Sequence, residues 1–566
     1  MPKPIYVLGT GLSHDGSSCI LKDGKILVAI EKERLTRIKH DGGSDAATVQ
    51  YCLDAAGIKL SNIDLIVQCA NFEKDEIKKN RFKGERIFYE DEQIPFVTIS
   101  HHLAHAYSAV GTSPFNECAV MVIDGCGSFY PQCDDLAKAY IPTHVNSLPG
   151  LYGEKDSYYY FDGKQLQSLY KDFSIINFLQ KPNEVYLPTS NHSIGGLYAM
   201  ASNYCLGSFD DAGKLMGLAP FGEDGIYKTA LFNLQDGNVW VNEEVMRQHF
   251  IFPMDEISHP FKKNFQHYAN IAKWVQQETE RAILYLFKHR LNFFPHQNIC
   301  YAGGVALNAV ANSKILQQTG IKNLYIEPAA GDNGLAIGCA YYGWMEVLKK
   351  EKVLHDGSTC FGKKYDEGSI EKALIEFGNN IVYQKENNTK DALEIVTNEL
   401  LKGKTVAWYQ QGAEFGPRAL GRRSILADPR LANIQQHINA NIKCREDFRP
   451  FAPVVLWEDR HEYFEEGIES EYMILIDKIK PEWKNIMPGI VHVDGTCRVQ
   501  TIKNKEESLY KLLEVWKAKS GISVLLNTSF NKKGMPIIET PSEAIKFFYE
   551  SALDVLVMHN FIVYKK

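Results

Sequence analysis

Apolar and polar positions alternate along the chain in a way that predicts short strands interleaved with helices. Apolar runs at 19–21 and 26–30 flank a Lys22-Asp23-Gly24 turn and predict a hairpin beside a first strand at 5–9. Further strands are expected at 65–69, 119–123, 298–301 and 323–326, and helices at 45–56, 270–291 and 305–317. Strands interleaved with helices of this length favour an α/β fold.

A change in residue pattern divides the chain. A predicted helix at 333–348 is followed by a polar, charged and glycine-containing stretch at 349–364. Regular patterning then resumes with a helix at 389–401 and a strand at 405–409. A chain of 566 residues has room for about two to four structural units. We therefore predict a first domain at 1–350, a linker at 351–364 and a second domain at 365–566.

Composition narrows the class of protein. Hydrophobic residues make up 45% and charged residues 23% of the chain, as in ordinary globular proteins. The formal net charge of −7 disfavours a nucleic-acid binder. Twelve cysteines without a CxxC pair, no signal-type leader and no run of 18 apolar residues predict a cytoplasmic protein without membrane spans.

Two histidines, His101 and His105, stand four residues apart in the segment SHHLAHAYSA. On a helix both imidazoles would project from one face, which is the spacing needed to hold one metal ion. A zinc protease would carry a general-base glutamate directly after the first histidine, whereas this chain has His102 there. The alternative is that the two imidazoles cap or pack a helix, and spacing alone leaves both interpretations open.

Two aspartates stand where metal ligands are expected. Asp124 ends the apolar run at 119–123 and opens a glycine-rich turn, and Asp332 precedes a predicted helix. Either carboxylate could instead cap a helix or a turn. Two imidazoles and two carboxylates would suit Fe(II), Mn(II) or Zn(II) if the four side chains met, which the sequence alone does not decide.

Glycine-rich loops and a basic segment are candidates for anion binding. The loops at 9–16 and 301–308 each follow a strand, and their N–H groups could approach a phosphate closely. Neither loop has a Walker or GxGxxG pattern, so a tight structural turn is the alternative. From Arg418 to Arg449, seven basic residues stand against three acidic ones. This excess predicts either an anion pocket or a solvated basic face.

Together these segments resemble a known family, the O-carbamoyltransferases that include the nodulation, cephem and tobramycin enzymes. The resemblance covers nearly the whole chain, from residue 9 to residue 531, and the string FGPRALGRRSILADPR is very specific. The matching segments, in family order, are GLSHDGS, HHLAHA, VIDGCGS, GKLMGLAP, AGGVALN, AAGDNGLAIG, FGPRALGRRSILADPR, REDFRPFAP and LLNTSFN.

The resemblance implies an N-terminal domain with the fold of actin, sugar kinases and heat-shock ATPases, related to the tRNA threonylcarbamoyl-transfer proteins. It implies a C-terminal YrdC-like α/β domain. The implied enzyme uses ATP, with magnesium, and carbamoyl phosphate to form carbamoyl adenylate. It then carbamoylates a hydroxyl of a natural product or sugar. A divalent metal, iron(II) with manganese or zinc as alternatives, is also implied, whereas the acceptor and the oligomeric state are not.

The resemblance also implies roles for individual residues. It assigns the metal ligands to His101, His105, Asp124 and Asp332. It assigns the adenylate and phosphate contacts of the first domain to His14, Lys39, Gly303, Gly304 and Asn308. It assigns binding of ATP and carbamoyl phosphate in the second domain to Arg418, Lys443, Arg449, Arg498, Thr528 and Ser529. Asp211 is the candidate that orients the acceptor hydroxyl, and the tyrosine-rich stretch 145–173 is expected to supply loops of the acceptor pocket.

Three other functions are compatible with parts of the pattern. A small-molecule kinase would share the first fold but would release ADP, whereas carbamoylation through an adenylate releases AMP. A tRNA-modifying enzyme is disfavoured by the net charge of −7. A nucleotide-gated binding module would show no ATP turnover that depends on carbamoyl phosphate.

Overall fold

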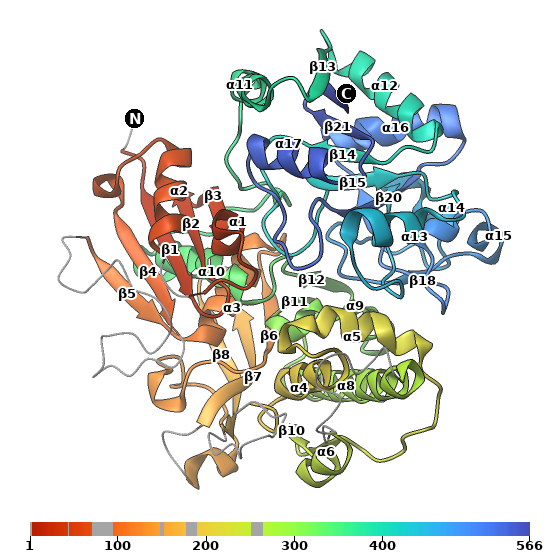
Figure 1. Cartoon of the computed structure of the whole chain (residues 1–566). Helices are drawn as coiled ribbons and strands as arrows, with labels where there is room; N and C mark the ends of the chain where they lie inside the picture. Colours follow the sequence, from red (N-terminus) through yellow and green to blue (C-terminus); the bar gives the residue numbers. More distant parts are fainter. Residues whose placement is uncertain (1–2, 43–44, 71–93, 148–151, 177–188, 251–263) are drawn as a thin grey trace. The chain divides into compact units, whose positions relative to one another are not determined.

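The computed structural model describes residues 3–42, 45–70, 94–147, 152–176, 189–250 and 264–566, which fall into two compact units (Figure 1). Unit 1 comprises Met1–Lys32 and His40–Ser358, and unit 2 comprises Glu33–Lys39 and Thr359–Lys566. Both units combine sheets with helices, so the predicted α/β class is confirmed. Within the described part of the chain, no helix combines the length and apolar character needed to cross a membrane.

Unit 1 contains two five-stranded sheets with the same topology. The first sheet has the order β3-β2-β1-β4-β5 and the second has the order β12-β11-β6-β7-β8. In each sheet the first three strands form an antiparallel meander, and the two later strands run parallel to the first. The strands are β1 (Tyr6–Leu12), β2 (Ser17–Lys22), β3 (Lys25–Glu31), β4 (Leu65–Ala70), β5 (Phe96–Ile99), β6 (Cys118–Ile123), β7 (Tyr152–Phe161), β8 (Leu166–Ile175), β11 (Asn298–Ala302) and β12 (Asn323–Ile326).

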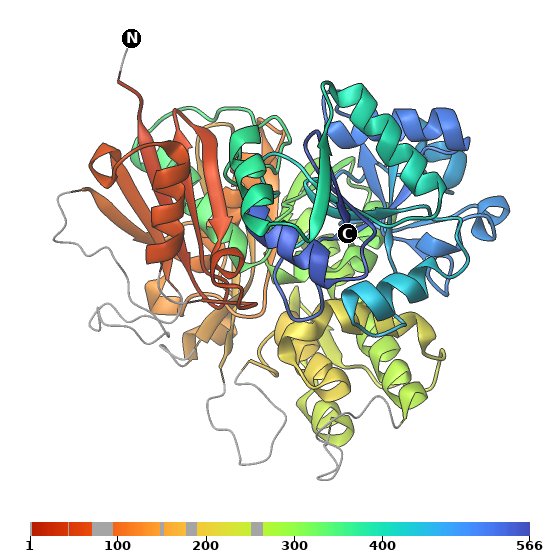
Figure 2. The same cartoon turned by 45° about the horizontal axis from the view of Figure 1, so that its top comes forward.

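In unit 1 some helices pack on the two sheets and others pack mainly on one another. The helices are α2 (Ala46–Ala56), α3 (His101–Thr112), α4 (Ile194–Leu206), α5 (Ala212–Leu218), α6 (Glu243–His249), α8 (Phe265–Phe293), α9 (Ala309–Gln318) and α10 (Leu335–Tyr342). In Figure 1 and Figure 2, α4 and α8 run side by side. Helix α10 packs on β1 and α3 so tightly that a Cβ atom on Gly338 would lie 1.8 Å from the carbonyl oxygen of Ala104. Glycine is therefore required where α10 meets the histidine-bearing helix.

Unit 2 is built on one eight-stranded mixed sheet with the order β13-β22-β21-β14-β15-β20-β16-β19. Its helices include α11 (Glu367–Phe377), α12 (Thr389–Leu401), α16 (Ser508–Ser520) and α17 (Pro541–Glu550). A continuous apolar core, which includes the fully buried Trp408 and Trp516, joins the sheet to these helices. The strands are β13 (Ile381–Lys385), β14 (Val406–Tyr409), β15 (Arg423–Ala427), β16 (Ala452–Leu456), β19 (Gln500–Ile502), β20 (Val524–Ser529), β21 (Val555–Met558) and β22 (Phe561–Lys565).

One short segment from the N-terminal part of the sequence groups with unit 2. It contains most of α1 (Lys32–Thr36) and ends at Lys39. The buried Arg34 donates a hydrogen bond to the carbonyl of Gly416 over 2.7 Å. Arg37 donates to the carbonyls of Pro536 and Ile537, each over 2.8 Å. Guanidinium groups that bind main-chain carbonyls therefore attach the 33–39 segment to unit 2.

The predicted elements agree with the structure except in three places. The helix expected at 333–348 is an α-helix only over Leu335–Tyr342, between a 3-10 turn at Asp332–Gly334 and a π-helical segment at Gly343–Val347. The helix expected at 305–317 is divided, because a 3-10 turn at Gly304–Leu307 precedes α9 and the side chain of Asn308 caps that helix. The loops expected within 145–173 are largely the two long strands β7 and β8. Charged residues in this tyrosine-rich stretch obscure its strand pattern, because several of them are buried as ion pairs.

Candidate functional site

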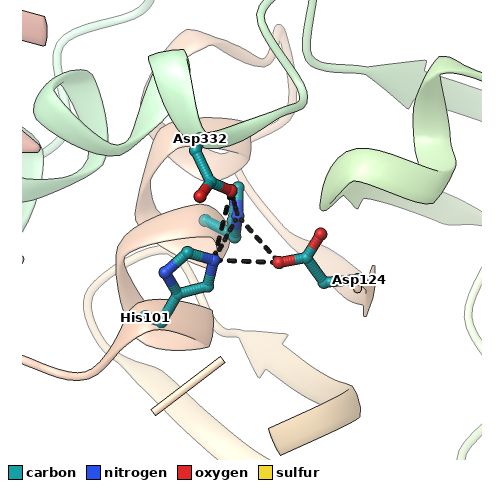
Figure 3. Close-up of side chains that lie close together, drawn as sticks. His101, Asp124 and Asp332 are labelled. Carbon is teal, nitrogen blue, oxygen red and sulfur yellow. Dashed lines mark hydrogen bonds and ion pairs between the residues drawn. The ribbon is translucent and has the colours of Figure 1, made fainter. Parts of the chain in front are cut away.

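Four predicted ligand side chains converge in unit 1. They form the metal-type cluster of His101, His105, Asp124 and Asp332, in which all the facing atoms lie within 4.8 Å of one another. His101 Nε2 lies 2.9 Å from Asp124 Oδ2 and 3.3 Å from Asp332 Oδ1 (Figure 3). His105 Nε2 lies 3.7 and 3.6 Å from the same two oxygens and 3.1 Å from His101 Nε2. The four side chains are at most 7% exposed.

These distances fit a metal ion. Imidazole nitrogens and carboxylate oxygens bind zinc at about 2.0–2.2 Å, which in a tetrahedral or octahedral site separates neighbouring ligand atoms by roughly 3.0–3.6 Å. The distances between the two histidines, and from each histidine to the two aspartates, run from 2.9 to 3.7 Å. Two imidazoles with two carboxylates also suit Fe(II) and Mn(II). The residues present therefore fit a divalent transition metal.

Each carboxylate of the metal-type cluster is oriented through its other oxygen. The backbone N–H of Gly304 donates to Asp124 Oδ1 over 2.8 Å. A ring nitrogen of His14 lies 3.0 Å from Asp332 Oδ2. Gly303 has φ 92°, and a Cβ atom there would lie 2.3 Å from the carbonyl oxygen of Ile123. Gly303, Gly304 and His14, which were predicted to contact adenylate or phosphate, thus lie against the metal-type cluster.

The histidines and aspartates of the metal-type cluster stabilise one another's charged forms. Burial opposes a charged imidazole, but Asp332 and Asp124 outweigh it and raise the pKa of His101 well above its usual value. Burial also opposes ionisation of the two carboxylates, yet the histidines hold the pKa of Asp124 and of Asp332 well below the usual range. A metal ion would replace the imidazole protons, because a histidine must be deprotonated to bind it. The pocket is therefore suited to hold positive charge.

Other predicted residues of unit 1 have structural partners. The Asn308 side chain accepts the N–H of Ala311 and exchanges two hydrogen bonds with Gln276. Asp211 forms a 2.6 Å ion pair with Lys214 at the start of α5. The predicted roles of Asn308 in nucleotide binding and of Asp211 in acceptor orientation remain predictions.

In unit 2, five basic side chains form a cationic cluster: Arg418, Lys443, Arg445, Arg449 and Arg498. Burial and repulsion from Arg449 lower the pKa of Arg418 to about 10. Burial and neighbouring guanidinium groups lower the pKa of Lys443 and Arg498 well below their usual values. The Nε atoms of Arg418 and Arg498 are buried without a hydrogen-bond partner among the described residues. Glu446 lies 3.9 Å from Arg449, and the five basic groups outnumber this nearby acid, so positive charge is in excess here.

Contacts divide the basic residues into two groups. Lys443 Nζ lies 2.5 Å from the carbonyl oxygen of Ser529, 3.1 Å from its hydroxyl and 2.6 Å from Asn531 Oδ1. Ser529 follows Thr528 at the end of β20. By contrast, Arg423 is fully buried and donates to the carbonyls of Gln410 and Glu539. Arg423 is therefore a structural residue, although it belongs to the basic sequence run.

Lys39 differs from its expected place. The family resemblance groups it with the contacts of the first domain, but it ends the 33–39 segment and groups with unit 2. Its charge contributes to lowering the pKa of Lys443. Lys39 is therefore a neighbour of the cationic cluster, because the hydrogen bonds of Arg34 and Arg37 attach its segment to unit 2.

Several residues that support these sites were not predicted. Ser128 Oγ accepts the N–H of His101, and Glu154 accepts the N–H groups of His102 and Ser128. Arg445 belongs to the basic run but was not predicted as a binding residue. Consecutive charges at 154–156 within a tyrosine-rich stretch are a signal that could have indicated a buried charge network.

Comparison with known proteins agrees with the sequence motifs. Residues 7–93 and 85–341 match the family described as carbamoyltransferase N-terminus, and residues 397–565 match carbamoyltransferase C-terminus. An uncharacterised protein of Synechocystis is 32% identical, with 99% of this chain and 97% of that protein covered. Among solved structures, HypF of T. kodakarensis aligns more distantly, with 14% identity, a TM-score of 0.39 and coverage of 62% of this chain and 49% of that one.

Relatives whose names describe a function also support the carbamoyltransferase family. The nodulation protein NolNO of Sinorhizobium fredii is 28% identical, with 98% of this chain and 79% of that protein covered. The 3'-hydroxymethylcephem-O-carbamoyltransferase of Amycolatopsis lactamdurans is 26% identical, with 96% of each chain covered. The family models together span most of both units. The chain therefore belongs to the carbamoyltransferase family and is a transferase enzyme.

Proposed function

We propose that this enzyme uses ATP to activate carbamoyl phosphate and transfers the carbamoyl group to a hydroxyl of a small molecule. In the first half-reaction, water hydrolyses carbamoyl phosphate to carbamate and phosphate, the carbamate oxygen bonds to the α-phosphorus of ATP, and pyrophosphate leaves. In the second, the acceptor oxygen bonds to the carbamoyl carbon, AMP leaves, and the hydroxyl proton passes to a base. The acceptor class follows the name of the cephem O-carbamoyltransferase relative.

The observation that carries the proposal is the cationic cluster of unit 2. Both substrates of the first half-reaction are polyanions, and negative charge gathers at the α-phosphate as pyrophosphate leaves. Planar guanidinium groups suit bidentate contacts with phosphate oxygens, and Lys443 supplies a point charge. Buried cations that repel one another are costly in isolation, so a bound polyanion would stabilise this arrangement. We assign adenylate formation to Arg418, Lys443, Arg449 and Arg498, with Thr528 and Ser529 beside them.

We assign carbamoyl transfer to unit 1. His101, His105, Asp124 and Asp332 would hold a divalent metal, for which iron(II) is the first candidate and manganese or zinc the alternatives. When bound, the metal would supply Lewis-acid polarisation of a carbonyl or orientation of the acceptor oxygen. His14 and Gly304 orient the two carboxylates through their second oxygens.

The domain architecture is part of the proposal. Two sheets of identical topology in unit 1 support a duplicated ATPase-like domain of the actin and sugar-kinase type. We propose a YrdC-like domain for unit 2, in keeping with the family resemblance. The duplicated topology also favours a small-molecule kinase as the alternative function, because sugar kinases share that fold.

The nucleotide product separates these two functions. The purified chain is incubated with ATP, magnesium and carbamoyl phosphate, and pyrophosphate, AMP and ADP are quantified. The proposal predicts pyrophosphate release that depends on carbamoyl phosphate, with AMP rather than ADP as the nucleotide product. Production of ADP on adding hydroxylated acceptors, without pyrophosphate, would support the kinase instead. A mass-spectrometric screen for acceptors that gain a carbamoyl mass then identifies the substrate.

A further inference from the structure

A buried charge network adjoins the metal-type cluster and has no role in the chemistry proposed above. Cys133, Asp135 and Glu154 bring three ligand-type side chains together. The ammonium of Lys171 fills this group, since its Nζ lies 2.7 and 2.8 Å from the oxygens of Asp135 and 2.5 Å from Glu154 Oε1. A fixed cation in that place argues against a second metal site. The role of the network is indicated instead by what Glu154 contacts.

Glu154 supplies a missing helix cap. Helix α3 starts at His101, and the side chain of its N-cap residue, Ser100, makes no capping hydrogen bond. The first N–H groups of a helix have no partner within the helix and need one elsewhere. Ser128 Oγ accepts the N–H of His101 over 2.9 Å, and Glu154 Oε2 accepts the N–H of His102 over 3.2 Å. Side chains distant in sequence thus cap the helix that bears both histidine ligands.

The same carboxylate also holds the segment that bears Asp124. Glu154 Oε2 accepts the N–H of Ser128 over 2.9 Å, four residues after Asp124. Backbone hydrogen bonds between β7 and this turn add to the connection, from Gly127 N to Glu154 O and from Glu154 N to Ser128 O. A Cβ atom on Gly127 would lie 2.6 Å from Glu154 Oε2, so this close approach requires glycine. One oxygen therefore joins the α3 terminus to the turn after β6.

We propose that Glu154, fixed by Lys171 and Asp135, is a positioning residue that sets the spacing between the two histidine ligands and Asp124. The inference rests on the metal site of the proposed function. The carboxylate is fully buried and stays ionised, because Lys171 and His102 outweigh burial and lower its pKa to about 2. Only an acceptor with two oxygens can face the ammonium on one side and two N–H groups on the other.

Glu154→Gln tests this role with little change in shape. The substituted amide places an NH2 donor either against the Lys171 ammonium or against the two backbone N–H groups. Residues that orient metal ligands typically contribute about 10–100-fold to metal affinity. We expect a loss of that size in the affinity of the metal-free chain for Co²⁺, measured by chelator competition. Ser128→Ala, a milder change that removes only the acceptor for His101 N–H, should weaken Co²⁺ in the same direction.

Asp156→Asn is the matched control. Asp156 is also a buried carboxylate on β7, and it pairs with Arg290 over 2.5 Å rather than with the α3 terminus. We expect it to lower the thermal stability of the metal-free chain while leaving Co²⁺ affinity unchanged. Equal Co²⁺ affinity in wild type and Glu154→Gln, or affinity losses that simply follow stability in all three variants, would overturn the positioning role. A wild-type chain that binds no Co²⁺, Mn²⁺ or Fe²⁺ would instead overturn the metal site itself, and the inference with it.

Discussion

At the scale of single residues, each carboxylate of the metal-type cluster divides its oxygens between the cluster and an orienting partner. Asp124 faces His101 with Oδ2 and accepts Gly304 N–H with Oδ1. Asp332 faces the histidines with Oδ1 and His14 with Oδ2. Such outer partners fix the direction of a ligand before the metal arrives. The metal-type cluster is therefore preorganised by partners outside its four side chains.

Removing a ligand should remove the metal. His101→Ala and Asp332→Ala each delete one of about four ligands, and we expect metal content to fall to a small fraction of the wild-type value. Inductively coupled plasma mass spectrometry of protein purified in parallel measures this content. His296→Ala, at a half-buried histidine outside the cluster, should leave it unchanged. Full metal occupancy in the His101→Ala, Asp332→Ala double variant would rule out the assignment.

The sequence could predict the residues of the metal-type cluster but not how they are supported. His101 and His105 have a spacing that helix geometry explains locally, and Asp124 and Asp332 stand out at the end of a strand and before a helix, whereas only the family resemblance joins the four. Their convergence depends on α3 packing against α10 and on strand order, which no local pattern specifies. Glu154 was missed because its partners lie 26 and 52 residues away in sequence. Hydrogen bonds between residues so distant in sequence produce no periodic pattern of residue types in the sequence.

At the scale of elements, the 33–39 segment is the least expected feature. Its residues follow β3 directly, yet Arg34 and Arg37 bind carbonyls 382 and 499–500 residues away. Arg37 contacts Pro536 and Ile537, in the stretch that follows Ser529 and Asn531, the partners of Lys443. The segment thus supports the part of unit 2 that holds Lys443. The sequence analysis predicts no helix at 32–36, and local patterning does not indicate which unit such a segment joins.

Loss of Arg37 should weaken both this attachment and anion binding. A hydrogen bond to a charged group contributes about 1.5–3 kcal/mol, so Arg37→Ala, which removes two such bonds, is expected to lower the free energy of unfolding by about 3 kcal/mol or more. Urea unfolding measures it, and titration with pyrophosphate should show an affinity that is reduced several-fold. Arg37→Lys should recover part of both losses. Arg247→Ala, at an exposed arginine paired with Glu243, should change neither, and equal effects of Arg37→Ala and Arg247→Ala would contradict this role.

At the scale of the whole molecule, the sign of the net charge differs from the sign of the charge that is concentrated in unit 2. The chain carries a net charge of −7, yet five basic groups lie together in unit 2. Burial and mutual repulsion lower the pKa values of Arg418, Lys443, Arg445 and Arg498, and Arg449 contributes to that repulsion. Such a cluster is a source of instability until an anion binds. The net charge alone therefore does not reveal the local excess of positive charge in the cationic cluster.

A polyanion should accordingly stabilise the protein. A ligand that binds only the folded state at about 100 times its Kd adds about 2.7 kcal/mol of stability. We expect pyrophosphate to raise the melting temperature of the wild type, measured by differential scanning calorimetry at constant ionic strength. Arg498→Ala should lose most of this rise, whereas Arg281→Ala, in unit 1 and paired with Glu278, should keep it. The same rise in both variants would indicate binding elsewhere.

The central claim is that the two half-reactions belong to different sites, and carbamoyl-phosphate-dependent pyrophosphate release tests it most directly. Lys443→Ala removes a charge-assisted contact of about 1.5–3 kcal/mol and should slow this release by about one to two orders of magnitude. His105→Ala alters only the metal-type cluster, so release should stay near the wild-type rate while carbamoylation of an acceptor is lost. If His105→Ala stops pyrophosphate release as completely as Lys443→Ala does, the proposed division between the two sites is wrong.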